Sequence, residues 1–186
     1  MNRQEAWDLM TQYTKSENLR KHMLAVEAAM RFYAKKFDED EEKWAVVGLL
    51  HDFDYEQHPT PEEHPFVGVK ILQEKGYPEE ITRAILSHAD YSGVVPESNM
   101  EKSLFAVDEL SSFIVAVSLV RPSKSILDLK VKSVKKKLKT KAFAANVSRE
   151  DIQKGSEMLE LSLEEHIQNV IDAMKTIAGD LGLAEN

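Results

Sequence analysis

The sequence predicts an all-α protein, a helical bundle that forms a single domain over residues 1–186. Apolar residues recur at three- and four-residue steps through almost the whole chain, which is the spacing of one helix face. No segment shows the convincing alternation of apolar and polar residues that is typical of a β-strand. With 42% hydrophobic and 30% charged residues, a chain of 186 residues can bury one core.

Caps and apolar spacing predict the first three helices. A short helix covers about residues 3–13. Ser16 is the expected N-cap of the second helix, whose apolar face includes Leu19 and Met23. The third helix starts among the acidic residues 38–42, which suit the positive end of a helix dipole, and continues through the apolar run 44–50. This third helix is therefore expected to be central and buried on most sides.

Prolines and glycines set the remaining boundaries. The stretch 54–63 contains two prolines and is expected to be a loop. Pro65 suits the first residue of the next helix, with His64 at or near its N-cap and Gly76 at its end. The further elements expected are a helix from Pro78 to about His88, a loop through Gly93 and Pro96, a long helix over about 101–120, a lysine-rich helix and an amphipathic C-terminal helix.

The composition excludes several kinds of chemistry. The chain has no cysteine, which excludes disulfides, thiolate metal ligands and a cysteine nucleophile. Glycine-rich phosphate loops and the serine elbow of hydrolases are also missing from the sequence. The N-terminus lacks the apolar core of a signal peptide, and the longest apolar stretches are far shorter than the roughly 20 residues that span a bilayer. We therefore expect a cytoplasmic protein with no membrane contact.

Charge is distributed unevenly along the chain. The net charge is −8, yet residues 129–149 contain seven lysines, one arginine and no acid. An acidic protein is a poor general binder of nucleic acid, so no stable complex with nucleic acid is expected. The basic segment can attract a small anionic molecule, or it can be a solvated helix face.

Six residues with metal-binding side chains fall on largely apolar helical faces or at their ends. Asp108 is the most telling, because it shares a face with Leu104 and Val115 and a buried carboxylate is costly unless it is paired or bound to a cation. Taken singly, the others have structural alternatives, such as a core histidine or a helix cap. The full set is His22, His51, Asp52, His64, His88 and Asp108.

The spacing of these six residues allows them to meet. Each interval between the segments that carry them leaves room for a helix and its turn, so helices of one bundle can bring them to one site. A mixture of imidazole and carboxylate ligands suits manganese, iron, cobalt, nickel or zinc rather than calcium. The sequence therefore predicts one or two divalent transition-metal ions, bound between the helix that ends near His51 and the helix centred on Asp108.

The ordered series His, His-Asp, His, His, Asp resembles the HD-domain superfamily of HDIG type. That superfamily is all-helical and consists mostly of metal-dependent phosphohydrolases. The resemblance is strongest over residues 22–120, and it implies that residues 121–186 form a C-terminal helical extension packed on the same domain. The segments His51–Glu56 and His88–Tyr91 are similar to a branch of small bacterial HD hydrolases. If two metals are bound, the resemblance implies that Asp52 bridges them.

The resemblance implies a phosphohydrolase that cleaves a phosphomonoester or phosphodiester in a small anionic substrate, with a nucleotide as one option. His51 and Asp52 would be the catalytic residues. The candidates for substrate binding are Arg121 and Lys124, which otherwise form a solvated helix exit, and Asp54 and Asp90, which otherwise orient imidazoles or are solvated loop acids. His58 and His166 are expected at the surface.

The contexts of His64 and His88 are similar to those of the cyclic-dinucleotide phosphodiesterases of the HD-GYP group, which usually carry a lysine shortly after the His-Asp pair. Here the residues Asp54, Tyr55 and Glu56 follow the pair instead, so the chain departs from the pattern of that group.

Two other functions remain open. Proteins resembling myo-inositol oxygenase use the same ligand order, so a di-iron oxygenase is one alternative. A non-catalytic binding module that keeps its metal is the other, and the C-terminal helix can serve a homodimer or pack on its own bundle.

Overall fold

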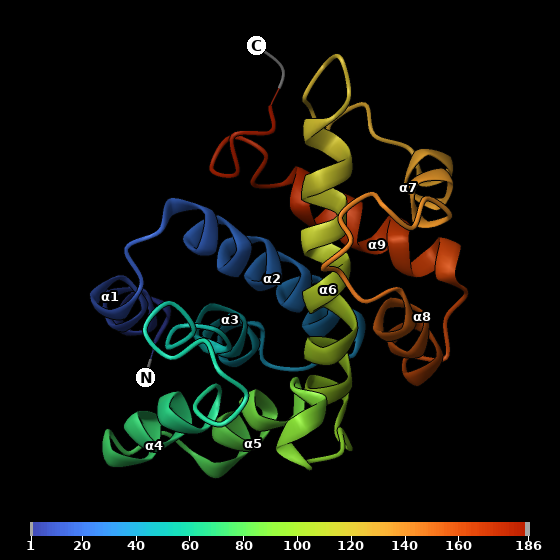
Figure 1. The fold of residues 1–186 in the computed structure, drawn as a ribbon. Helices are drawn as coiled ribbons and strands as arrows, with labels where there is room; N and C mark the ends of the chain where they lie inside the picture. The colour runs from blue at the N-terminus through green and yellow to red at the C-terminus, as the bar shows by residue number, and fades with distance from the viewer. Residues whose placement is uncertain (1, 185–186) are drawn as a thin grey trace.

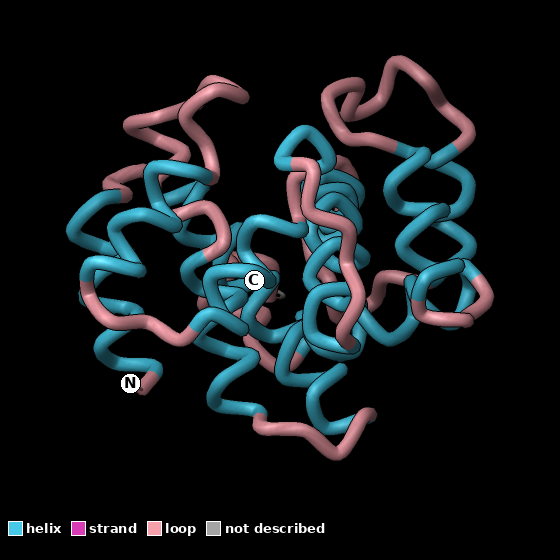
Figure 2. Tube along the Cα trace, turned by 90° about the horizontal axis from the view of Figure 1, so that it is seen from below, coloured by secondary structure: helices cyan, strands magenta, loops and turns pink. Residues whose placement is uncertain are grey.

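The computed structural model describes residues 2–184, and within this range every regular element is a helix. The predicted all-α class is therefore confirmed, and Figure 2 shows helices joined by loops throughout. None of these helices is long and apolar enough to cross a bilayer. Their bounds are α1 Arg3–Tyr13, α2 Glu17–Lys36, α3 Glu41–Leu50, α4 Phe66–Glu74, α5 Glu79–Ser87, the short 3-10 turn η1 Asp90–Ser92, α6 Asn99–Leu119, α7 Val131–Leu138, α8 Arg149–Met158 and α9 Leu163–Lys175.

Side-chain caps start the first three helices where the sequence predicts them. The Ser16 hydroxyl accepts a hydrogen bond from the backbone N–H of Leu19 and begins α2. The Asp40 carboxylate accepts from two backbone N–H groups in the first turn of α3. Every residue from Trp44 to Leu50 is buried, which confirms that α3 is buried on most sides.

Two predicted boundaries are shifted by one or two residues. Pro65 is the N-cap of α4 rather than its first helical residue, so His64 lies in the preceding turn. Helix α6 begins at Asn99 because Ser98 and Glu101 form a reciprocal capping box. Such a box satisfies free N–H groups on the first turn, and it allows the helix to start before its apolar pattern is evident.

The helices pack around a crossing of α2 and α6 (Figure 1). Helix α3 packs along α2, while α5 lies at the lower end of α6 in that view and α4 packs against α5. The C-terminal helices α7, α8 and α9 cover the other side, with α8 against α6 and α9 against both α2 and α6. The core between them contains large side chains that are fully enclosed, among them Met23, Tyr33, Trp44, Phe53 and Phe113.

Two glycines allow the helices to approach closely. A Cβ atom on Gly48 of α3 would lie 2.8 Å from Cα of Glu27 in α2, and a Cβ on Gly155 of α8 would lie 2.6 Å from Cα of Ala106 in α6. No real Cβ tolerates such contacts with backbone, so these positions require glycine. The two close contacts fix the separation of α2 from α3 and of α6 from α8, the helices that surround the site described below.

His166 is not at the surface, contrary to the sequence-based prediction. It is fully buried in α9, where its Nδ1 lies 2.6 Å from the Tyr33 hydroxyl and its Nε2 lies 2.9 Å from the carbonyl oxygen of Ala106. The ring therefore accepts from Tyr33 and donates to Ala106. Burial lowers the pKa of His166 to about 4, although the hydrogen bond to Ala106 opposes the shift.

Burial of the His166 ring makes the stability of the folded protein fall as the pH decreases. The unfolded chain protonates His166 as the pH falls through about 6.5, whereas the folded chain resists protonation until about pH 4. The unfolded state thus binds more protons in this window, and stability is lost as the pH falls through it. We expect the stability advantage of wild type over His166→Gln to shrink by on the order of 3 kcal/mol between pH 7.5 and 4.

Urea unfolding followed by circular dichroism at several pH values measures this difference. His58→Gln is the control, because His58 is only partly buried, in a loop. An advantage that stays constant from pH 7.5 to pH 4 would contradict the account of His166.

Candidate metal centre

The structure brings all six predicted metal-binding residues into one cluster, although they come from different elements. One histidine lies on α2, a His-Asp pair follows α3, one histidine precedes α4, one is the C-cap of α5, and an aspartate lies in the middle of α6. The side chains form two groups of donors, each with atoms close enough to share an ion: His22, His51 and Asp108 in the first, and Asp52, His64 and His88 in the second.

The first group is formed by α2, α3 and α6. The Nε2 atoms of His22 and His51 lie 3.1 Å apart. The Oδ1 atom of Asp108 lies 3.0 Å from Nε2 of His22 and 3.5 Å from Nε2 of His51. Three donor atoms thus face a common point between three helices.

The second group lies beside the first and is linked to it by Asp52. The Nε2 atoms of His64 and His88 lie 3.3 Å apart, and Oδ1 of Asp52 lies 3.2 Å and 3.4 Å from them. The other oxygen, Oδ2, lies 3.6 Å from Nε2 of both His22 and His51. The Asp52 carboxylate therefore presents one oxygen to each group, which is the geometry of a bridging ligand.

The donor spacing fits divalent transition metals. Zinc–nitrogen bonds of about 2.0–2.1 Å at angles between roughly 90° and 110° would separate two nitrogen ligands by about 2.9–3.4 Å. The two histidine pairs, at 3.1 Å and 3.3 Å, lie within this range. Two imidazole nitrogens aimed at each other at this distance also need a proton or a cation between them, because both carry lone pairs otherwise.

Hydrogen bonds on the far side of each ring orient the imidazoles. The Nδ1 atoms of His51 and His88 lie at hydrogen-bonding distance from backbone carbonyl oxygens three residues earlier, in the last turns of α3 and α5. Nδ1 of His22 lies 3.0 Å from the Ser112 hydroxyl of α6. With Nδ1 acting as the donor to a carbonyl, Nε2 is left as the acceptor that can bind a metal.

Asp54 orients His64, and the prediction that it lies among substrate contacts is not supported by its position. Its side chain is buried, with Oδ1 2.8 Å from Nδ1 of His64 and Oδ2 accepting from the backbone N–H of Gly68 at 2.7 Å. A Cβ on Gly68 would lie 2.7 Å from Cγ of Asp54. Glycine is thus required at position 68 so that the carboxylate can reach both partners.

The charges within the cluster stabilise one another. Burial by itself raises the pKa of the Asp52 carboxyl, but the charge of His51 and hydrogen bonds with His64 and His88 outweigh it and hold that pKa well below its usual value. Burial by itself lowers the pKa of His64, but hydrogen bonds to Asp52 and Asp54 outweigh it and raise that pKa to about 9. The cluster therefore has ionised carboxylates that attract positive charge.

The cluster lies in a cavity of about 560 Å³. Helices α2, α6 and α8 and the segments after α3 and α5 contribute to its walls, so residues of the C-terminal region lie beside the donors. Besides five of the six donors, the walls contain Asn18, Leu19, Tyr55, Ala89, Asp90, Tyr91, Phe105, Glu109, Ser112, Asn146, Val147 and Asp151.

Arg121 and Lys124, which were predicted to contact substrate, do not line this cavity. Arg121 follows Asp108 by 13 residues, which corresponds to about 20 Å along a helix axis. Its guanidinium binds the Asp128 carboxylate in the turn after α6. Asp90 does line the cavity, but it is exposed and its Oδ1 lies 3.4 Å from Nζ of Lys154. Lys154, Glu109 and Asp151 were not predicted from the sequence, because none of them belongs to a recognisable motif.

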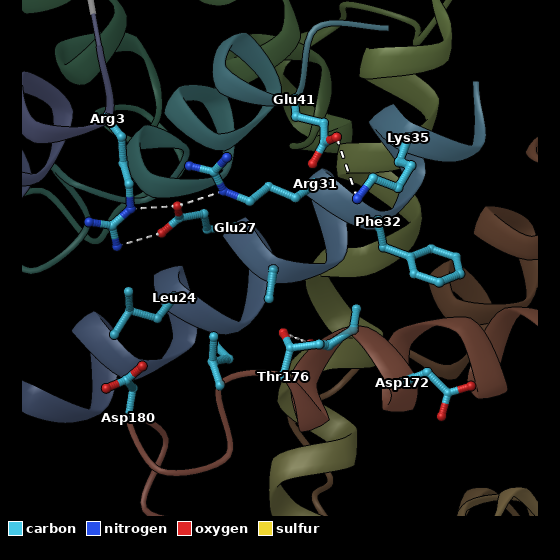
Figure 3. A pocket seen from close by; sticks show the side chains of 13 residues that line it. Arg3, Leu24, Glu27, Arg31, Phe32, Lys35, Glu41, Asp172, Thr176 and Asp180 are labelled. Atoms are coloured by element: carbon cyan, nitrogen blue, oxygen red, sulfur yellow. Dashed lines mark hydrogen bonds and ion pairs between the residues drawn. The ribbon is translucent and has the colours of Figure 1, made fainter. Parts of the chain in front are cut away.

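A second cavity of about 560 Å³ lies on a different face of α2 and contains none of the six donors (Figure 3). Its charged residues are largely paired with one another. Nε of Arg3 and Nε of Arg31 lie 2.7 Å and 3.1 Å from the same oxygen of the buried Glu27 side chain, toward which both guanidinium groups point in Figure 3. This arrangement ties the N-terminus to α2 and has no chemistry in common with the metal centre.

The match to a protein family agrees with this geometry. The sequence model of the family described as HD domain matches residues 19–177, which is most of the chain. The chain therefore belongs to the HD-domain family, a superfamily of metal-dependent hydrolases. The match contains all six donors and extends through α9. No curated protein and no solved structure matches the chain.

The contact between Gly68 and Asp54 yields a test of the metal centre. Gly68→Ala is expected to displace the Asp54 carboxylate and release the His64 ring, which should weaken metal binding by roughly 10- to 100-fold. A competition titration with manganese or zinc measures the affinity. Gly179→Ala is the matched control, because a Cβ there meets no atom within 4 Å and the backbone angle is ordinary. Equal affinities for the Gly68→Ala and Gly179→Ala proteins would contradict this role of Asp54.

Proposed function

We propose that this HD-domain protein is a metal-dependent phosphohydrolase that cleaves a phosphomonoester or phosphodiester in a small substrate, nucleotides included. The observation that carries the proposal is the position of Asp52, whose two oxygens face the two donor groups separately. Such an arrangement suits a pair of divalent ions held side by side. Binuclear sites of this kind are well adapted to displacement at phosphorus, because one ion can face the attacking oxygen and the other the leaving oxygen.

Each donor has a proposed role in holding the ions. His22, His51 and Asp108 would bind one ion, His64 and His88 the other, and Asp52 both. When bound, divalent ions supply a more acidic water molecule and positive charge against the phosphoryl oxygens. The native ion is proposed to be one of manganese, iron, cobalt, nickel or zinc, since the donor set mixes imidazoles with carboxylates.

The protein groups themselves keep the carboxylates ionised and the imidazole rings oriented. The low pKa of the Asp52 and Asp108 carboxyls keeps both ionised at neutral pH, so they act as ligands rather than as proton donors. The hydrogen bonds on Nδ1 of His51, His64 and His88 hold the rings with Nε2 toward the cluster. The substrate would enter from the open side of the cavity, beside the exposed rings of Tyr55 and Tyr91.

Removal of the bridging carboxylate tests the proposal. We expect Asp52→Ala to abolish hydrolysis of phosphomonoesters and phosphodiesters and to lower the metal content, because both donor groups lose a ligand. Elemental analysis and a phosphatase assay with added manganese measure the two effects. His58→Ala is the control, since His58 lies outside the cavity and is partly exposed. His166→Ala is unsuitable as a control because that ring is buried and hydrogen-bonded.

Three outcomes of these assays would contradict the proposal. Equal turnover by Asp52→Ala and wild type would remove Asp52 from the reaction. An iron-loaded protein with mixed-valence signals, oxygen consumption and no phosphoester hydrolysis would replace the proposal with a di-iron oxygenase. A metal-loaded protein that is inert toward both phosphoesters and oxygen would indicate a binding module.

A further inference from the structure

Among the residues that the structure describes, the lining of the cavity that contains the metal centre has five acids and no lysine or arginine. Its carboxylates are those of Asp52, Asp90, Asp108, Glu109 and Asp151. Apart from the histidines of the metal centre, the charged side chains that a phosphate group would meet in this cavity are all carboxylates. Phosphate sites in proteins usually add cationic donors to the metals, because charge-assisted hydrogen bonds fix the phosphoryl oxygens. A cation close to the rim is therefore needed.

Lys154 of α8 places its ammonium group against two residues of the cavity wall. Its Nζ lies 3.4 Å from Oδ1 of Asp90 and 4.9 Å from the centre of the Phe105 ring. Both residues line the cavity. Phe105 belongs to α6, three residues before Asp108, so the ring that supports the ammonium lies one helical turn from a metal donor.

Other cations near the centre are less suitable. The Arg149 guanidinium donates to the carbonyl oxygens of Val147, Ala144 and Phe143, and these bonds hold the preceding loop. Lys21 lines an adjoining cavity of about 320 Å³, which shares Asn18, His22 and Ser112 with the metal cavity. Its remaining walls are apolar and are formed in part by Leu119 and Leu181. Lys154, by contrast, contacts the wall of the metal cavity directly, through its ion pair with Asp90 and its position over the Phe105 ring.

The present partners of Lys154 hold it loosely. Its side chain is 45% exposed and that of Asp90 is 58% exposed. Ion pairs this exposed contribute little to stability, because water and salt screen them and both side chains lose freedom. The Phe105 ring stabilises the ammonium at the rim without satisfying its hydrogen bonds. The ammonium can therefore exchange the Asp90 carboxylate for a more highly charged phosphate at low cost.

We propose that Lys154 is a substrate-binding residue that donates a hydrogen bond to a phosphoryl oxygen, with Asp90 as the partner that holds it when the site is empty of substrate. This rests on the proposed function. The C-terminal region thus contributes a charge to the site, and α8 is more than a packing element. The role that the sequence suggested for Arg121 and Lys124 belongs to Lys154 of α8.

Binding of inorganic phosphate to the manganese-loaded protein, measured by calorimetry, tests this role without any turnover. We expect Lys154→Gln to weaken phosphate binding at least tenfold while the manganese content stays unchanged. Asp90→Asn should tighten phosphate binding several-fold, because it frees the ammonium. In the double variant Asp90→Asn/Lys154→Gln the benefit of the first change should disappear, since it acts only through the lysine.

Lys21→Gln is the matched control, because it removes an equivalent charge from the adjoining cavity. Its phosphate affinity is expected to equal that of wild type. Equal phosphate affinity of wild type and Lys154→Gln, or a loss in Lys21→Gln as large as that in Lys154→Gln, would overturn the proposal. Failure of the proposed function would look different: phosphate would bind in a manner that depends on Lys154, yet no phosphoester would be hydrolysed.

Discussion

The arrangement of the site depends on one carboxylate, that of Asp52, which faces four imidazole nitrogens. A largely buried carboxylate is unfavourable by itself, and so is a cluster of histidines that carry protons. Together they stabilise each other, which explains why the pKa of Asp52 falls while that of His64 rises. The same mutual dependence means that a divalent ion can replace the protons, since the cluster needs positive charge between its donors in either state.

This constraint accounts for the packing of the helices around the site. The donors lie within α2 and α6 or next to the ends of α3, α4 and α5, so their positions are set by how closely the helices approach. Gly48 permits the close contact of α2 and α3, and its carbonyl oxygen accepts the hydrogen bond from the His51 ring. Gly68 similarly admits the Asp54 carboxylate that holds His64. Glycine at these two positions therefore determines the orientation of imidazoles that lie several residues away.

Much of the fold could be predicted because its signals are local. Ser16, Asp40 and the apolar run of α3 act within their own helix, and the structure has these helices where the sequence indicates. The six donors could be found for a related reason, since polar side chains on apolar faces need a partner and the family resemblance supplied their order. The family match over residues 19–177 supports that resemblance.

The residues whose positions the sequence did not predict are those that depend on contacts between helices distant in sequence. His166 has a polar side chain near the start of an amphipathic helix, and only the packing of α9 against α2 and α6 encloses it with Tyr33. Arg121 follows Asp108 by only 13 residues in the sequence, but the rise of α6 carries it away from the cavity.

The position of α8 extends the same argument to the C-terminal region. Gly155 lets α8 lie directly on Ala106 of α6, and this contact sets Lys154 over Phe105, next to the wall that carries Asp108. A bulkier residue at position 155 would push α8 outward together with the Lys154 ammonium, which lies against two residues of the cavity wall. The same close packing that buries apolar surface between α6 and α8 therefore also places a positive charge at the cavity rim, so stability and the electrostatic character of the rim depend on one helix contact.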